Sequence, residues 1–229
     1  MRLSVKSLLF DYGGTIDTNG LHWGEFIRRT YANFNVPVSP EIFREAYVQI
    51  ERQLGCQPLI LPTFTFRETL AIKIKLQFEV LGIIDLCLEK QIVDACYEKV
   101  YFHTQNAARL LDRLKESYPM YLVSNFYGNL RTVLHEFNLT PYFQAVIESA
   151  VVGARKPDPE IFRIAIEKTG NRPEETLVIG DSYKNDIRPA MLLGFHSIWL
   201  KINGFDETDA TIEHPYIIGD FSELAEILL

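Results

Sequence analysis

Four short polar clusters in this sequence combine the residue types of a nucleophilic active site. They are Asp11 with the glycine turn that follows it, Ser124-Asn125, a lysine within residues 155–159, and a further carboxylate at Asp181. A carboxylate can attack an electrophile, a hydroxyl can donate a hydrogen bond, a lysine can neutralise negative charge, and a second carboxylate can bind a metal ion. No single cluster is diagnostic, because many strands simply end in a polar turn.

Three of these clusters follow short, mostly apolar runs, at residues 8–10, 120–123 and 176–179. Such runs are typical of strands buried in a parallel sheet. Ligands of open α/β sheets bind at the carboxyl ends of the strands, so the clusters are expected to meet at one edge. Gly13 and Gly14 would let the backbone turn tightly and approach a ligand closely.

From residue 106 onward the pattern alternates between helix and strand. Strands are predicted at 120–123, 144–148, 176–179, 197–200 and 216–218. This alternation favours an α/β fold, a doubly wound parallel (Rossmann-like) sheet with helices on both faces.

Residues 18–104 carry helical apolar stripes and no strand signal. Ser39-Pro40 is typical of a helix start, Thr65 with Glu68 forms a capping-box pattern, and a further helix is predicted near 89–102. We therefore predict a core domain of residues 1–17 and 105–229, with residues 18–104 inserted as an all-helical cap domain.

Composition limits the possible partners and surroundings. The net charge is −7 and no basic run is present, which argues against nucleic acid and anionic membranes as partners. The three cysteines lack metal-site or disulfide spacing, and no apolar run approaches a membrane span. A cytoplasmic protein is expected, and the sequence leaves its oligomeric state open.

The four clusters, taken in order, resemble the motifs of the haloacid dehalogenase (HAD) superfamily. The matching segments are Phe10–Thr15, Val123–Asn125, Gly153–Phe162 and Gly180–Asp186. The helical insert after the first motif resembles the cap of the first subfamily.

This resemblance implies a hydrolase, a phosphatase acting on a small phosphorylated substrate with Mg²⁺ as cofactor. It implies that Asp11 is the nucleophile that forms an aspartyl-phosphate, with Ser124 and Lys156 as the other catalytic residues. The expected substrate-binding residues are Gly14, Thr15, Ser124, Asn125 and Lys156. The expected metal ligands are Asp11, the Gly13 carbonyl and Asp181, with Asp186 orienting the lysine or a metal-bound water from behind.

Position 13 departs from the pattern of the family's phosphatases. They usually carry a second Asp two residues after the nucleophile, which protonates the leaving oxygen and later activates water; here that position is Gly13. General acid–base catalysis typically contributes about 10²–10⁴-fold. Gly13 therefore argues against simple alkyl phosphates as good substrates.

Asp17 could replace the missing acid, although a turn or capping Asp at the cap hinge is the favoured interpretation. Several polar residues of the hinge and cap could face the substrate: His22, Arg28, Arg29 and Arg67.

Three alternatives to phosphatase activity remain open on the sequence. In a 2-haloacid dehalogenase Asp11 would attack carbon, but retention of Asp181 and Asp186 favours a metal site. A phosphonoacetaldehyde hydrolase needs a Schiff-base lysine, and no matching motif surrounds the cap lysines Lys73, Lys75, Lys90 and Lys99. A catalytically impaired protein that binds a phosphoryl ligand is the third alternative, raised by Gly13.

Overall fold

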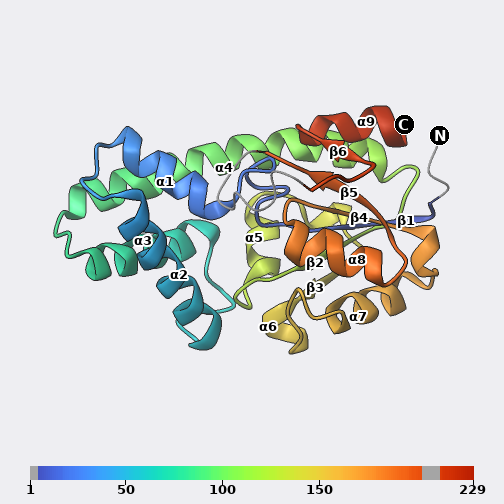
Figure 1. The fold of residues 1–229 in the computed structure, drawn as a ribbon, viewed down its shortest axis with the longest axis horizontal. Helices are drawn as coiled ribbons and strands as arrows, with labels where there is room; N and C mark the ends of the chain where they lie inside the picture. Colours follow the sequence, from blue (N-terminus) through green and yellow to red (C-terminus); the bar gives the residue numbers. More distant parts are fainter. Residues whose placement is uncertain (1–4, 203–211) are drawn as a thin grey trace.

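The computed structural model describes residues 5–202 and 212–229, and a parallel sheet flanked by helices forms its core (Figure 1). The strands are β1 (Ser7–Phe10), β2 (Met120–Ser124), β3 (Ala145–Glu148), β4 (Thr176–Gly180), β5 (His196–Leu200) and β6 (Ile217–Ile218). Their order is β3-β2-β1-β4-β5-β6, and every neighbouring pair is parallel. The predicted doubly wound sheet is confirmed.

Strand β1 is the point where the strand order reverses. Phe10 pairs with Leu122 of β2 on one side and with Ile179 of β4 on the other. A crevice forms outside the carboxyl ends of the strands at such a point. Asp11, the residue after β1, therefore stands where this class of sheet binds its ligands.

Helices cover both faces of the sheet because alternate strand side chains point in opposite directions. Leu8 and Phe10 belong to a core that includes residues of α5 (Leu130–Glu136), α9 (Leu224–Leu228) and the end of α4 (Leu86–Leu114). Leu9 lies in a second core with residues of α7 (Glu160–Thr169) and α8 (Arg188–Leu192), and the short α6 (Ser149–Val152) follows β3. The sheet is thus buried on both sides.

The inserted segment forms a helical bundle beside the sheet (Figure 1). It contains α1 (Trp23–Asn33), α2 (Pro40–Cys56), α3 (Phe66–Leu81) and the first part of α4. The Ser39 side chain accepts from the Ile42 N–H, and Thr65 and Glu68 form the predicted capping box. None of the six described strands comes from residues 18–104.

The connection from the bundle back to the sheet differs from the prediction. The sequence predicts a helix near 89–102 that ends before the core domain starts at 105, but α4 is one continuous helix of 29 residues. Residues 86–114 contain no glycine or proline, so nothing in the sequence interrupts the helix. The proposed domain boundary at 105 falls inside this helix.

Within the described ranges, no helix is both long and apolar enough to cross a membrane.

Candidate active site

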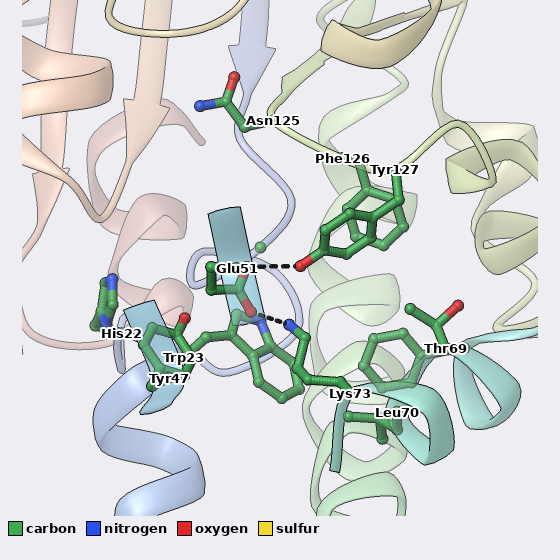
Figure 2. Close-up of a pocket in the computed structure, with 12 residues that line it drawn as sticks. His22, Trp23, Tyr47, Glu51, Thr69, Leu70, Lys73, Asn125, Phe126 and Tyr127 are labelled. Carbon is green, nitrogen blue, oxygen red and sulfur yellow. Dashed lines mark hydrogen bonds and ion pairs between the residues drawn. The ribbon is translucent and has the colours of Figure 1, made fainter. Parts of the chain in front are cut away.

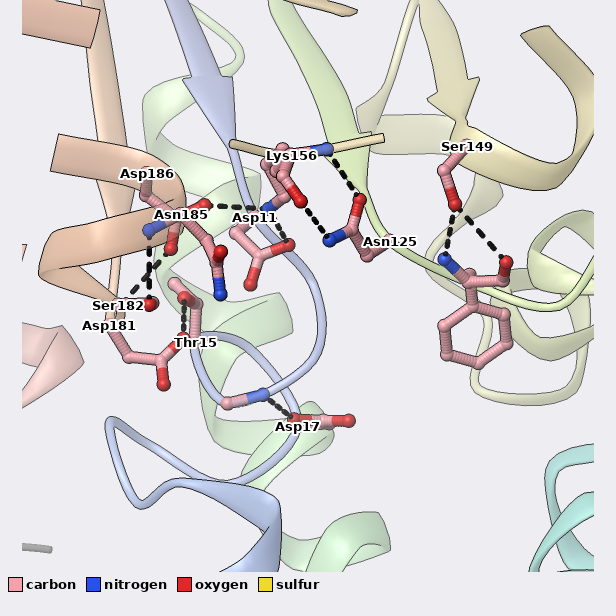
Figure 3. A network of polar contacts seen from close by, with 12 residues as sticks. Asp11, Thr15, Asp17, Asn125, Ser149, Lys156, Asp181, Ser182, Asn185 and Asp186 are labelled. Carbon is pink, nitrogen blue, oxygen red and sulfur yellow. Dashed lines mark hydrogen bonds and ion pairs between the residues drawn. The ribbon is translucent and has the colours of Figure 1, made fainter. Parts of the chain in front are cut away.

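The polar clusters meet at the carboxyl edge of the sheet (Figure 3). They surround a small cavity of about 90 Å³. Asp11 follows β1, Ser124 ends β2, Asp181 follows β4, and Lys156 lies in the loop before α7. The cavity is lined by Asp11, Gly13, His22, Ser124, Asn125, Lys156, Asp181, Ser182, Asn185 and Asp186. Sequence reasoning placed most of these residues in one site, and it missed Ser182 and Asn185.

Lys156 lies between two carboxylates. Its Nζ is 2.6 Å from Asp11 Oδ1 and 2.6 Å from Asp186 Oδ1, and all three side chains are buried. Burial alone would lower the pKa of Lys156, but the two carboxylates outweigh it and hold that pKa above its ordinary value. Lys156 is therefore a permanent ammonium that fixes the orientation of Asp11.

Asn125 holds the backbone of Lys156 in place. Its Nδ2 donates to the Lys156 carbonyl at 3.0 Å, and its Oδ1 accepts from the Lys156 N–H at 2.9 Å. Asn125 also lines the cavity. The amide thus joins the end of β2 to the loop that carries the lysine.

Asp11, Asp181 and Asp186 form a carboxylate cluster. One oxygen from each lies within 4.8 Å of the others. Desolvation, reinforced by the charges of Asp11 and Asp186, raises the pKa of Asp181 well above its ordinary value. A bound divalent cation would relieve this repulsion, and carboxylate and carbonyl oxygens suit Mg²⁺. The donor set, with Gly13 on the same cavity wall, fits such an ion.

Two glycines leave room for the side chains of Asp181 and Asp186 to lie close to the backbone of the site. Gly14 has φ +96°, and a β-carbon there would lie 2.4 Å from Asp181 Oδ2. A β-carbon on Gly180 would lie 2.5 Å from Asp186 Cβ. Larger residues at either position would push these carboxylates out of the cluster.

Ser124 presents an unused hydroxyl to the cavity. Its Oγ is buried and has no hydrogen-bond partner within residues 5–202 and 212–229. A buried polar group without a partner costs free energy, which favours a ligand that can bond to it. Such a hydroxyl fits the donor expected for a phosphoryl group.

Two of the expected substrate-binding residues lie behind the cavity wall. The Thr15 hydroxyl donates to Asp181 Oδ1 at 3.2 Å, and the Gly14 N–H donates to Asp17 Oδ1 at 2.7 Å. Neither residue is among those that line the cavity. In this structure they position Asp181 and the loop.

Asp17 is also placed behind the cavity. It is fully buried and accepts from the Gly14 N–H and, at 2.9 Å, from Trp23 Nε1. Burial raises the pKa of Asp17 to about 7. These contacts correspond to the turn and hinge role that the sequence favours, since both oxygens are engaged by the chain itself.

A second cavity of about 130 Å³ lies between the sheet and the helical bundle (Figure 2). It shares Gly13, His22 and Asn125 with the first cavity. Of the polar cap residues that could face a substrate, His22 does line it, whereas Arg28 and Arg29 pair with Glu25 and Arg67 pairs with Asp94. Lys73, one of the cap lysines considered for a Schiff base, pairs on its wall with Glu51, and sequence reasoning did not predict this pair.

The state of Lys73 bears on the Schiff-base alternative. Burial would lower the pKa of Lys73, but Glu51 and then Tyr47 outweigh it, so the pKa is raised. A lysine held as an ammonium is a poor nucleophile toward an aldehyde. Lys73 is therefore suited to binding through its charge.

Comparison with known proteins agrees with this architecture. A family model described as haloacid dehalogenase-like hydrolase matches residues 5–194. The rhythmically expressed gene 2 protein of Drosophila melanogaster is 30% identical over 196 residues, which cover 81% of this chain and 70% of that protein.

Two phosphatases match over a shorter stretch. A phosphoserine phosphatase of Thermus thermophilus is 37% identical over 92 residues, and a glyceraldehyde 3-phosphate phosphatase of Pyrococcus furiosus is 32% identical over 92 residues. Each match covers 39% of this chain, and only 36% and 38% of the two relatives.

Among solved structures, the HAD-hydrolase YfnB of Bacillus subtilis, bound to magnesium, has a TM-score of 0.60. It is 23% identical, and the match covers 100% of this chain and 99% of that one. At this level of identity the likeness concerns the fold.

Proposed function

Because the chain belongs to the haloacid dehalogenase-like hydrolases, we propose that it is a magnesium-dependent phosphatase acting on a small phosphorylated metabolite. The observation that carries the proposal is one cavity that holds a lysine-oriented Asp11, a carboxylate cluster and the unpartnered hydroxyl of Ser124. Its phosphatase relatives support the same class of reaction.

Asp11 is the proposed nucleophile. A carboxylate oxygen attacks phosphorus, the bond from phosphorus to the ester oxygen breaks, and the leaving group departs with the electron pair. Lys156 holds Oδ1 of Asp11 at 2.6 Å, which leaves the second oxygen to attack. The Ser124 hydroxyl donates to a phosphoryl oxygen, and the Lys156 ammonium offsets the negative charge that gathers in the site.

Magnesium is the proposed cofactor, held by Asp11, Asp181 and the Gly13 carbonyl. When bound, it neutralises phosphoryl charge and screens the carboxylates from one another. Asp186 stays on Lys156, and Thr15 orients Asp181. Residues 18–104 act as the cap that closes the site against water.

The second half-reaction returns Asp11 to its carboxylate form. Water attacks phosphorus of the aspartyl-phosphate, the bond to the Asp11 oxygen breaks, and inorganic phosphate is released. Gly13 provides no side chain to take a proton from this water. We therefore infer that this step is slow and limits turnover.

The retained carboxylate cluster distinguishes this proposal from dehalogenation. Attack of Asp11 on carbon displaces a halide, and that reaction has no need of Asp181 beside Asp11. One oxygen of Asp181 lies within 4.8 Å of those of Asp11 and Asp186.

Rapid mixing with 4-nitrophenyl phosphate and Mg²⁺ tests the proposal. We expect a burst of nitrophenolate close to one per active site, followed by slow turnover, with phosphate trapped on Asp11 and found by peptide mass spectrometry. Asp11→Asn removes both burst and label. Absence of both in the wild-type chain, or chloride release from 2-chloropropionate that EDTA leaves unchanged, contradicts the proposal.

A further inference from the structure

The second cavity is the place where the non-phosphoryl part of a substrate must lie. It shares Gly13, His22 and Asn125 with the cavity of Asp11 and Lys156, so the two spaces adjoin. Gly13 has no side chain to separate them. A group esterified to a phosphoryl unit beside Asp11 therefore extends past Gly13 and under the cap.

Aromatic side chains form most of the apolar wall of this second cavity (Figure 2). The rings belong to Trp23, Tyr47, Phe66, Phe126 and Tyr127. Aromatic faces and edges favour flat partners. The volume of about 130 Å³ can accommodate a small flat group such as a single six-membered ring.

An ion pair between the buried Lys73 and the half-buried Glu51 lies on the same wall (Figure 2). Lys73 Nζ is 2.7 Å from Glu51 Oε1, and it lies 5.3 Å from the ring centroids of Trp23 and of Tyr127. The hydroxyl of Tyr127 donates to Glu51 Oε2 at 2.7 Å. Lys73 is 6% exposed, so its charge acts in a largely dry environment.

Hydrogen-bond capacity at this pair is unbalanced. Glu51 Oε2 accepts from Tyr127, whereas Glu51 Oε1 lies 2.7 Å from Lys73 Nζ as an ion pair and accepts no hydrogen bond of regular geometry within the described residues. An ammonium can donate three hydrogen bonds, and Glu51 is the one carboxylate paired with Lys73 among the described residues. The Lys73 ammonium therefore keeps N–H donors for an oxygen acceptor on a ligand.

We propose that Lys73 determines specificity by binding an oxygen acceptor, a carboxylate or a carbonyl, on a small flat leaving group. This rests on the proposed phosphatase function and names its substrate class: a phosphate monoester of a phenol-like or enol-like group with an oxygen acceptor at its far end. Gly13 supports the same class independently, because such groups leave without protonation.

The test compares four probes that differ at one ring position: phenyl phosphate, 4-carboxyphenyl phosphate, 4-acetylphenyl phosphate and 4-(aminomethyl)phenyl phosphate. The two acceptor probes distinguish a charged from a neutral oxygen. The enzymes are the wild type, Lys73→Met, and Lys75→Met as the control. Lys75 lies on the same helix but is exposed, 3.9 Å from Glu79. The double variant Lys73→Met/Glu51→Gln avoids leaving the half-buried Glu51 carboxylate without its cation.

For each probe, the wild-type kcat/KM is divided by that of the variant, which removes the effect of the leaving group's own reactivity. Lys73→Met and the double variant should lower kcat/KM for at least one acceptor probe by about 10–100-fold more than for phenyl phosphate, as expected when a charged hydrogen bond is lost. Lys75→Met should lower none selectively. An equal loss on all four probes, or a wild-type preference for the aminomethyl probe, overturns the proposal.

Calorimetric measurement of the binding of 4-hydroxybenzoate and 4-hydroxyacetophenone distinguishes the proposed phosphatase function from the proposed acceptor site at Lys73. Binding that requires Lys73, in a chain that hydrolyses none of the probes, contradicts the phosphatase function and supports the acceptor site. Hydrolysis of phenyl phosphate, with acceptor binding and turnover that do not depend on Lys73, supports the phosphatase function and contradicts the acceptor site.

Discussion

The indole of Trp23 lies beside Gly13: a β-carbon at position 13 would be 3.8 Å from both Cδ1 and Nε1 of that ring. This is an ordinary van der Waals distance, so position 13 has room for a β-carbon. The indole N–H is already bonded to Asp17 at 2.9 Å. Steric crowding at the β-carbon therefore does not explain why position 13 carries no acid.

Asp181→Asn should weaken divalent-metal binding and phosphatase activity together. The change removes one of the clustered negative charges that attract the ion, so we expect the affinity for Mg²⁺ or Mn²⁺ to fall at least about tenfold. Calorimetric titration and the metal dependence of kcat/KM measure this effect. Asp112→Asn, which alters an exposed carboxylate, is the control. Wild-type activity that survives EDTA contradicts the proposed cofactor.

Lys156→Met should be far more destabilising than an exposed lysine change. It leaves Asp11 and Asp186 buried without their shared cation, a loss of about 3–5 kcal/mol in the free energy of unfolding. Lys6→Met, which breaks a solvent-exposed pair with Glu175, should cost far less, because exposed ion pairs contribute little to stability. Urea unfolding at pH 7 measures both. Similar costs for the two variants would show that Lys156 is not the counterion of a buried pair.

Asp17 should make stability depend on pH. Its pKa is raised from 3.8 to about 7 in the folded chain, chiefly by burial, so between these values the unfolded chain ionises and the folded chain stays protonated. Stability is therefore lost as pH rises from about 4 to 7, by up to about 4 kcal/mol for roughly three pKa units, and is constant above.

Comparison with Asp17→Asn isolates this contribution. The difference in unfolding free energy, wild type minus variant, should fall as pH rises from 4 to 7. The variant keeps an oxygen acceptor for the Gly14 N–H. A difference that is flat, or that rises with pH, would mean that Asp17 is ionised in the folded chain.

The sequence predicts the sheet well because each strand is marked by its own residues. The runs at 8–10 and 120–123, and the run at 176–179 after its first residue, are apolar and end at polar turns, and each is a strand. Helix α4 continues past the predicted end near residue 102, because the apolar pattern changes there without the glycine or proline that would stop a helix. Residues 86–114 contain no such residue.

The candidate site also contains some residues that the sequence predicts and others that it does not. Asp11, Ser124, Lys156 and Asp181 could be placed together because each belongs to a motif at a strand end or before a helix. The Lys73–Glu51 pair could not, since it depends on how α2 packs against α3. On their own helices both residues follow the pattern of ordinary surface charges, and no local signal distinguishes Lys73 from Lys75.

The central claim is that Asp11 transfers a phosphoryl group without an acid at position 13. The most direct test measures kcat/KM for monoesters from 4-nitrophenyl phosphate to sugar phosphates in the wild type, Gly13→Asp and Gly13→Asn. We expect the wild-type values to fall steeply as the leaving group becomes more basic. Gly13→Asp should raise kcat/KM for alkyl esters about 10–100-fold more than kcat/KM for aryl esters. Gly13→Asn should not favour alkyl esters in this way. Equal acceleration of both classes, or none, would contradict the claim and show that another group already supplies the proton.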